Sequence, residues 1–330
     1  MTGLTTAIRL AEKGHSVRVF ADAYLSSTTS WIATAIWHVF WVSVTDRVVG
    51  WAADSLAELL RLSELPETGV TRVRGIECLR ESAPQADLVS SDVANFWREI
   101  VPYYESLSRD EVISRLPDDY PTETISGGYV IEVPIADMSI YMPYLHRRLD
   151  SLGVPLHHLH VATLDEFRQR VSSDVYVNCT GLGARELLND TALRAVKGQI
   201  VRVSKGNISQ YIADDFSPRG MTYILPRQND IILGGSEDAG VDDSSVDLAF
   251  GAEIIDRCTS LMPELQEHEV YEHMAGLRPY RRGAIRLERD EIASDTIHNY
   301  GHGGSGVSLS WGCADEVAGL VEQTPFRSRR

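Results

Sequence analysis

Two segments near the C-terminal end of the chain carry residue types that could bind a flat cofactor and a small acid. The run from Asn299 to Gly306 holds four glycines within six residues and leads into a helical pattern of apolar residues. Glycines allow a backbone to approach a planar ligand, and a helix N-terminus favours negative charge. Upstream, Arg278 lies in the segment Gly276–Arg281, and its guanidinium could hold a carboxylate through two parallel hydrogen bonds. The two segments therefore predict a site for a cofactor beside a small acid.

The first 22 residues look like part of a dinucleotide-binding unit. Helical spacing of apolar residues predicts a helix that ends near Gly14, and a strand over 16–20 leads to Asp22. Gly3 fits the third glycine of the pattern G-x-G-x-x-G, and Asp22 fits the acid that holds a ribose hydroxyl about 20 residues later. The first strand and the first two glycines of this pattern are absent from the sequence. We expect either a start codon assigned too far downstream or a shortened protein that binds its cofactor poorly.

Composition and charge argue against several functional classes. The chain has 330 residues and a formal net charge of −16, which would repel nucleic acid. Its four cysteines are far apart and lack zinc-ligand spacing, so we expect no metal site. No secretory signal is evident, and the most apolar stretch, 31–44, is shorter than the roughly 20 residues that span a bilayer. We expect a cytoplasmic protein with no membrane segment and no nucleic-acid partner.

Periodicity along the chain predicts the elements that must position these residues. Helices are predicted over 46–62 and 92–107, and Asp137 is expected to cap a helix that ends near residue 149. The charged segment 108–123 is expected to be a mobile loop over the site. Strands are predicted over 70–79, 129–134, 154–161, 174–178, 196–203, 222–226 and 231–235.

Strands alternate with helices at both ends of the chain, and antiparallel-looking strands cluster between them, which predicts a mixed α/β fold. We expect a Rossmann-like parallel layer, without its first strand, built from residues 1–45, 150–195 and 285–330. Residues 46–149 and 196–284 would form mainly a substrate domain with an inserted antiparallel sheet. The site is expected between the two parts.

Seven motifs, specific in their order and spacing, cover essentially the whole chain. They are Ala21-Asp22; Thr28-Thr29-Ser30 with Ala35-Ile36-Trp37; Val177-Asn178-Cys179-Thr180-Gly181; Lys197-Gly198-Gln199; Thr222-Tyr223-Ile224-Leu225-Pro226 with Leu233-Gly234-Gly235; Gly276-Leu277-Arg278-Pro279; and Asn299-Tyr300-Gly301-His302-Gly303-Gly304 with Trp311-Gly312-Cys313-Ala314. Through these residues the chain resembles the D-amino-acid oxidase family of FAD-dependent flavoproteins, which includes D-aspartate oxidase and is related to glycine oxidase.

This resemblance implies roles for the substrate site. Arg278 and Tyr223 would bind the substrate carboxylate, the Gly304 carbonyl would face the amine, and Ile36 and His38 would line the pocket. No side chain would act as acid or base. Positioned substrate would transfer a hydride to the N5 atom of the flavin, and the imino acid would hydrolyse to a 2-oxo acid and ammonia. Dioxygen would then reoxidise the flavin and give hydrogen peroxide.

The resemblance also implies a set of residues along the FAD. The helix predicted to begin near Gly306 would point its positive end at the flavin. His302 would order the glycine-rich loop. The implied FAD-binding residues are Gly3, Asp22, Thr28, Thr29, Val161, Thr180, Gly303, Gly304, Ser305, Gly306, Val307 and Ser308.

Substrate preference and two alternatives stay open at this point. Glu237 and Asp238 argue against an acidic substrate, which favours a neutral or basic D-amino acid. One alternative is an oxidase of the glycine or sarcosine type or of another secondary amine. The other is a cofactor-free relic of the fold, suggested by the absent first strand. The resemblance is also compatible with a homodimer.

Overall fold

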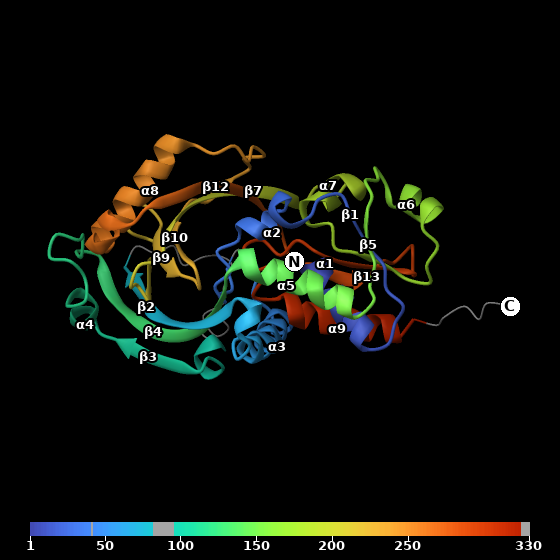
Figure 1. The fold of residues 1–330 in the computed structure, drawn as a ribbon, viewed down its shortest axis with the longest axis horizontal. Coiled ribbons are helices and arrows are strands. Elements are labelled where there is room, and N and C mark those ends of the chain that lie inside the picture. Colours follow the sequence, from blue (N-terminus) through green and yellow to red (C-terminus); the bar gives the residue numbers. More distant parts are fainter. Residues whose placement is uncertain (41, 82–95, 325–330) are drawn as a thin grey trace.

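The computed structural model describes residues 1–40, 42–81 and 96–324, and its ribbon is elongated with two parts side by side (Figure 1). The left part of the view contains a large curved sheet, and the right part contains two small sheets with helices around them. The helices are α1 (Thr2–Glu12), α2 (Thr29–Ile32), α3 (Asp46–Leu62), α4 (Arg109–Ile113), α5 (Met138–Ser151), α6 (Leu164–Arg170), α7 (Ala184–Leu187), α8 (Leu248–Leu261) and α9 (Ser310–Glu322).

Parallel strand pairs lie in the part with the small sheets. Strand β1 (Val19–Ala21) pairs in parallel with β5 (Leu156–His158). Strand β14 (Thr296–Tyr300) pairs in parallel with β6 (Tyr176–Asn178) and antiparallel with β13 (Arg286–Arg289). Helix α1 packs against α9, and the buried indole of Trp311 in α9 donates a hydrogen bond of 2.9 Å to Tyr141 in α5. These helices join the small sheets to the core.

The large sheet has nine strands, in the order β11-β7-β10-β9-β8-β2-β4-β3, with β12 also paired to β7. Only the short pairing of β2 with β8 is parallel among the described strands, and the other pairings are antiparallel. The strands are β2 (Val70–Arg80), β3 (Tyr103–Leu107), β4 (Ile125–Ala136), β7 (Leu193–Ser204), β8 (Tyr211–Asp214), β9 (Thr222–Pro226), β10 (Asp230–Gly234), β11 (Asp238–Ala239) and β12 (Val270–Arg281).

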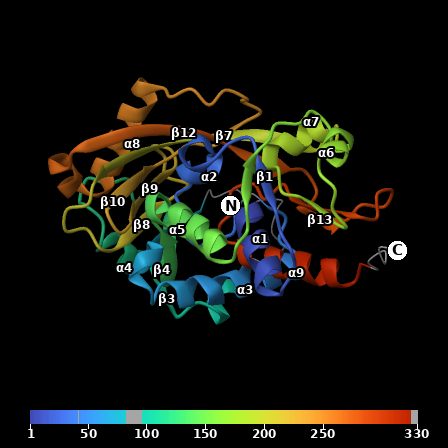
Figure 2. The same ribbon diagram turned by 45° about the vertical axis from the view of Figure 1, so that its right-hand side comes forward.

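Alternating side chains of this sheet enter two separate cores. Ile200 and Tyr223 belong to the core shared with α1, α3, α5 and α9, whereas Val201 and Ile224 belong to the core under α8. Figure 2 shows α8 on one side of the sheet and α3 and α5 on the other. We call the face that carries Ile200 and Tyr223 the inner face, because it is turned toward the small sheets. The predicted mixed α/β fold is thus confirmed.

Local sequence explains several of the elements that were predicted. The Asp137 carboxylate accepts a hydrogen bond from the Ser139 backbone N–H and caps α5, as expected. Strand β9 has the predicted bounds, and α3 begins and ends where its periodicity placed it. Within the described residues, no helix is both long and apolar enough to cross a membrane. The cytoplasmic localisation and the homodimer stay predictions.

The predicted helix over 92–107 is wrong in the part that the structure describes, 96–107. Tyr103–Leu107 is strand β3, paired antiparallel with β4, and a short 3-10 turn covers Phe96–Glu99. Residues 92–95 lie outside the described residues. Aromatic packing explains the difference, because Trp97 lies 4.6 Å from the Tyr129 ring and Tyr104 lies 6.1 Å from it. Tertiary contacts with β4 therefore override the helical spacing.

Two further expectations need correction. Segment 108–123 contains the short helix α4 with a capping box between Ser108 and Glu111, and Tyr120 at its far end is buried and donates to Asp214 at 2.8 Å. It is therefore anchored to the large sheet. The C-terminal helix α9 begins at Ser310 instead of near Gly306, because residues 306–309 form turns.

Candidate functional site

A cavity of about 1130 Å³ lies where the inner face of the large sheet meets the small sheets. Its volume exceeds the range of roughly 300–1,000 Å³ that is usual for small-molecule pockets, so it can hold a dinucleotide. Predicted residues that line it are Gly3, Asp22, Thr28, Thr29, Ile36, Val161, Thr180, Arg278, Gly303, Gly304, Gly306, Val307 and Ser308. Three predicted residues, His38, Tyr223 and Ser305, lie outside this lining.

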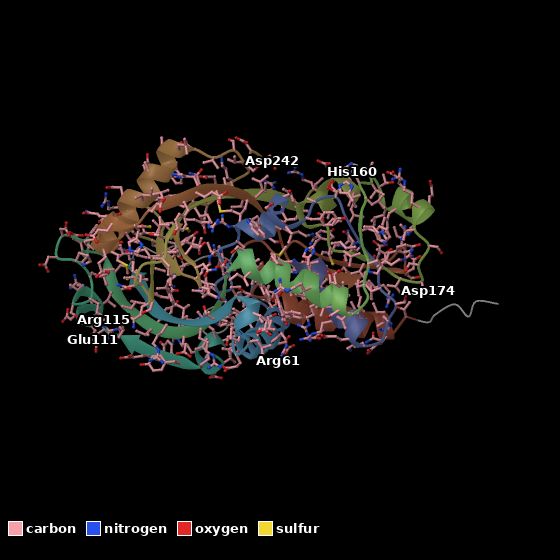
Figure 3. All side chains as sticks on the ribbon, viewed as in Figure 1. Arg61, Glu111, Arg115, His160, Asp174 and Asp242 are labelled. Atoms are coloured by element: carbon pink, nitrogen blue, oxygen red, sulfur yellow. The ribbon has the colours of Figure 1, made fainter. Side chains whose placement is uncertain are left out.

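One end of the cavity is formed by α1, β1 and the segment after β5. Asp22 follows β1 directly, and its carboxylate lies 2.7 Å from Nδ1 of His160. Figure 3 shows His160 at the periphery of the part that carries β1 and β5. Gly3 lies in the first turn of α1, where an added Cβ would come within 3.3 Å of the Cys179 side chain. The glycine therefore permits close packing of α1 on the turn after β6.

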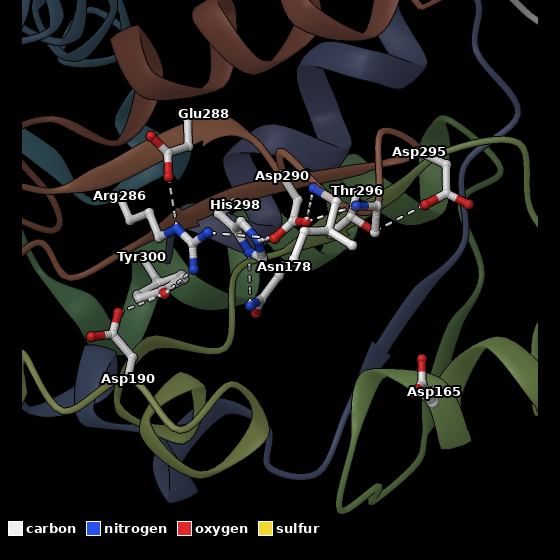
Figure 4. Close-up of polar contacts among 12 residues, drawn as sticks. Asp165, Asn178, Asp190, Arg286, Glu288, Asp290, Asp295, Thr296, His298 and Tyr300 are labelled. Atoms are coloured by element: carbon white, nitrogen blue, oxygen red, sulfur yellow. Dashed lines mark hydrogen bonds and ion pairs between the residues drawn. The ribbon is translucent and has the colours of Figure 1, made fainter.

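That turn is held by a chain of polar groups, of which Asn178 and His298 are buried (Figure 4). The Asn178 amide oxygen accepts hydrogen bonds from the Thr180 backbone N–H at 3.1 Å and the Thr180 hydroxyl at 2.8 Å. Its nitrogen then donates to Nδ1 of His298, which leaves Nε2 of that ring to donate to Asp290 at 2.9 Å. The network thus fixes Thr180 at the cavity wall.

Ionisation in this network follows from the same contacts. Hydrogen bonds from the Ala293 backbone and from His298 lower the pKa of Asp290 to about 2, so its carboxylate is charged. Burial lowers the pKa of His298, so its ring is neutral at neutral pH. Arg286 extends the network, because it contacts Asp290 at 3.4 Å and the Tyr300 hydroxyl at 3.1 Å. Each donor in this chain therefore has a defined acceptor.

The other end of the cavity is the inner face of the large sheet, where Arg278 of β12 lies across Gly198 of β7. A Cβ at Gly198 would lie 2.3 Å from Nη1 of Arg278, so only glycine leaves room for the guanidinium. Nη1 donates to the Ser236 carbonyl at 3.0 Å. The ring of Phe40 lies 5.9 Å below the guanidinium carbon. Arg278 is thereby held in one orientation at the cavity wall.

Tyr223 of β9 leans toward Arg278 from the opposite direction. A Cβ at Gly234 of the next strand, β10, would lie 2.0 Å from the ring carbon that carries the hydroxyl, so the ring crosses Gly234. Strands β10 and β7 lie between β9 and β12 in the sheet. The Tyr223 ring lies over β10 and the Arg278 guanidinium lies over β7, so the two side chains extend toward each other. Burial raises the pKa of Tyr223 and the charge of Arg278 opposes this shift, so the phenol stays protonated. A cation and a neutral donor therefore converge on one region.

The glycine-rich loop is fixed beside this region through hydroxyl groups. Ser305 Oγ donates to the Phe40 carbonyl at 2.7 Å and accepts from its N–H at 2.9 Å. Ser308 Oγ makes the same pair of bonds with the backbone of His38. A Cβ at Gly304 would lie 2.4 Å from the Phe40 ring, so this position also requires glycine. Ser305 and His38 thus support the loop instead of lining the cavity.

The start of α9 does not point free N–H groups into the cavity, contrary to the expectation from the sequence. The backbone N–H groups of Trp311 and Gly312 donate to Ser55 Oγ of α3 at 3.1 and 2.9 Å. These first-turn donors are satisfied within the core.

Comparison with known proteins identifies the family. The family model described as FAD dependent oxidoreductase matches residues 1–320. The chain belongs to this family. It is 39% identical over 323 residues to a D-amino-acid oxidase from Rubrobacter xylanophilus, covering 97% of this chain and 93% of the relative. It is 28% identical over 335 residues to a human D-aspartate oxidase, covering 98% and 92%.

Solved structures show the same fold. Glycine oxidase from Geobacillus kaustophilus superposes with a TM-score of 0.77 at 21% identity, over 99% of this chain and 94% of that chain. Iminodiacetate oxidase from Chelativorans superposes with a TM-score of 0.71 at 17% identity, over 98% and 94%. At these identities the likeness concerns the fold alone. Among the described residues, no group of three or more His, Cys, Asp or Glu side chains could hold a metal ion.

An unsatisfied buried group in the cavity fits the cofactor of this FAD-dependent family. His302 lines the cavity and is 3% exposed, yet its Nε2 atom has no hydrogen-bond partner. Burial lowers the pKa of His302 to about 3, so the ring is neutral and offers one donor or acceptor to a ligand. Such orphaned groups are rare in folded proteins unless a ligand or water satisfies them.

Several residues of the site escaped the sequence analysis. Phe40, which contacts Gly304 and lies near Arg278, belongs to an irregular segment and gave no periodic signal. His160 and His298 contact Asp22 and the Asn178 turn across sequence separations of more than 100 residues. Gly198 was part of a predicted motif but was assigned no role of its own. Glycine weakens the interior of a strand, so its presence there indicates a close contact with another group.

Proposed function

We propose that this protein is an FAD-dependent oxidase that deaminates D-amino acids to 2-oxo acids and ammonia, with production of hydrogen peroxide. The observation that carries the proposal is the convergence of Tyr223 on Arg278, which lines the cavity, with both side chains lying over glycines of the large sheet. The relatives named D-amino-acid oxidase support the same reaction. A neutral or basic D-amino acid is the proposed substrate, and dioxygen is the second substrate.

Binding of FAD would involve the predicted residues that line the cavity. We assign the dinucleotide end to Gly3, Asp22 and Thr180, and the flavin end to the loop from Gly303 to Ser308. Residues 1–45, 150–195 and 285–330 would form the cofactor part, and 46–149 with 196–284 the substrate part. Bound FAD would supply a two-electron acceptor that dioxygen can reoxidise.

The chain itself would orient the substrate. The Arg278 fork would hold the carboxylate through two hydrogen bonds, and the Tyr223 hydroxyl would donate a third. With the carboxylate fixed and the amine directed at the Gly304 carbonyl, only one configuration presents its α-hydrogen to the flavin side. Orientation of this kind contributes several orders of magnitude to a rate without an acid or base.

The test begins with protein reconstituted with FAD. Absorption spectra are recorded without oxygen before and after D-alanine or L-alanine, and peroxide is measured in air. We expect bleaching of the flavin and peroxide with the D-isomer only. Faster turnover of glycine or sarcosine than of any D-amino acid would instead assign the secondary-amine type. A folded protein that stays colourless with excess FAD would establish the cofactor-free relic.

Variants then test the carboxylate clamp. Arg278→Ala should lower kcat/KM for D-alanine by roughly 10² or more because a charged, oriented hydrogen-bond pair is lost. Arg282→Ala is the matched control, since that side chain is exposed four residues further on. If both variants retain the kcat/KM of the unmodified protein, the carboxylate assignment is wrong.

A further inference from the structure

A row of side chains crosses the inner face of the large sheet next to Tyr223. In register, Tyr129 of β4 pairs with Glu77 of β2, Glu77 with Ala213 of β8, and Ala213 with Tyr223 of β9. Cross-strand partners project on the same face, so Glu77 shares the face of Tyr223. The residue between them, Ala213, is small. With strands about 4.8 Å apart, the backbones of Glu77 and Tyr223 are about 10 Å apart.

Two further carboxylates lie around the same row. Asp215 comes two residues after Ala213, and Glu237 comes two residues after Gly235. A Cβ at Gly235 would lie 2.5 Å from the Tyr223 hydroxyl, which places the start of the Glu237 segment beside that phenol. Burial, followed by the charges of Glu237 and Asp214, raises the pKa of Asp215 to about 7. Burial and the charge of Asp215 raise the pKa of Glu77.

The adjacent carboxylate, Asp214, differs because it has both an ion-pair partner and hydrogen-bond partners. Asp214 is fully buried and pairs with the Arg80 guanidinium at 2.6 Å, and it also accepts from Tyr120. By contrast, neither Glu77 nor Asp215 forms an ion pair with any residue that the structure describes. Both side chains are half-buried, and a partly desolvated carboxylate without a cation is disfavoured. The two carboxylates are therefore complementary to a ligand that carries positive charge.

An unsatisfied hydroxyl points to the same place. Tyr211 is 1% exposed and lies across Gly75, where a Cβ would be 2.2 Å from its ring. Its hydroxyl is directed toward Glu77 but forms no hydrogen bond of normal geometry. The guanidinium of Arg98 stacks on Trp97 and Tyr104. The region around Glu77 therefore holds carboxylates without an ion-pair partner and a phenol hydroxyl without a hydrogen bond of normal geometry.

Resting on the proposed D-amino-acid oxidase activity, we propose that Glu77 and Asp215 bind the cationic side chain of a basic D-amino acid such as D-lysine. The carboxylate end of the substrate would lie at Arg278 and Tyr223, and its side chain would extend along the row toward Glu77. The strand spacing suits a long side chain, and the charges at the two ends of the site are complementary to those of the substrate.

The experiment compares D-lysine with D-norleucine, which has the same unbranched chain without the ammonium group. kcat/KM is measured for both substrates on the FAD-loaded enzyme and on Glu77→Gln and Asp215→Asn. We expect the unmodified enzyme to favour D-lysine by at least about tenfold and each variant to lower that ratio by about tenfold. Glu253→Gln removes an exposed carboxylate from α8, on the other side of the sheet, and should leave the ratio unchanged.

The outcomes separate the two levels of the proposal. If no D-amino acid bleaches the flavin, the proposed activity itself is wrong. If D-norleucine is oxidised but the unmodified enzyme does not favour D-lysine, the activity holds and the cationic subsite is refuted. This comparison needs no variant, so a folding defect in Glu77→Gln or Asp215→Asn cannot obscure it. A drop of the ratio in Glu253→Gln equal to that in the other variants would also refute the subsite, because only long-range charge would then matter.

Discussion

Replacing Gly198 by alanine tests whether Arg278 must lie where the structure places it. The new Cβ would lie 2.3 Å from Nη1, 2.4 Å from Nη2 and 2.5 Å from the guanidinium carbon. Normal contacts begin at about 3.5 Å, so the guanidinium must move by about 1 Å. A displacement of that size costs about 10²-fold in rate when the group orients a substrate. We therefore expect kcat/KM for D-alanine to fall about 10²-fold, although the charge is still present.

The fold should tolerate this substitution. The lost hydrogen bond from Arg278 to the Ser236 carbonyl would cost about 1.5–3 kcal/mol, and alanine in place of glycine within a strand returns about 0.5–1 kcal/mol. Peroxide assays give kcat/KM, flavin absorbance gives FAD content, and urea unfolding gives stability. Gly50→Ala in α3 is the control, because nothing lies within 4 Å of its Cβ. A Gly198→Ala enzyme with full FAD content and undiminished kcat/KM would refute the assignment of Arg278.

Three other perturbations give distinct results. Because the pKa of Asp215 is raised to about 7, its ionisation destabilises the fold as pH rises from about 4 to 7. Asp215→Asn should therefore raise the free energy of unfolding more at pH 8 than at pH 5. Equal effects at the two pH values in urea titrations would contradict this. Asp214→Asn leaves the buried Arg80 guanidinium without its carboxylate and should cost about 3–5 kcal/mol in the same titrations, so a loss below 1 kcal/mol would show that the pair is not needed. His298→Leu removes the acceptor of the Asn178 amide that orients Thr180; FAD titration followed by flavin fluorescence should show Kd raised about tenfold, whereas an unchanged Kd would separate this turn from the cofactor.

Local signals account for the elements that the sequence predicted well. Asp137 as a cap, the apolar periodicity of 46–62 and the apolar strand 222–226 depend on neighbours in sequence, so the pattern and the structure agree. Residues 103–107 form a strand because β4 lies beside them and Tyr129 packs against Tyr104 and Trp97. That information is tertiary, and no window of sequence contains it.

The candidate site shows the same division. The resemblance selected Arg278 and Tyr223, but only the register of the strands shows that they lie over glycines on one face and lean toward each other. Glu77 gave no signal, because a single acid in a strand predicts an exposed side chain unless the strand's partners are known. Its place in the row beside Tyr223 follows from two pairings that join distant segments.

The parallel pairing of β2 with β8 has a consequence for how substrate preference could change. This pairing joins strands β2, β3 and β4 to the remaining strands of the large sheet, and it consists of three residue pairs, from Gly75 with Tyr211 to Glu77 with Ala213. Glu77 belongs to the first group of strands, whereas Arg278 and Tyr223 belong to the second. A chimaera that takes 70–136 from a relative with another substrate would therefore exchange one wall of the side-chain pocket and keep the carboxylate clamp. The proposed contact through Glu77 can thus be exchanged separately from the proposed carboxylate clamp, whereas Asp215 stays with the clamp.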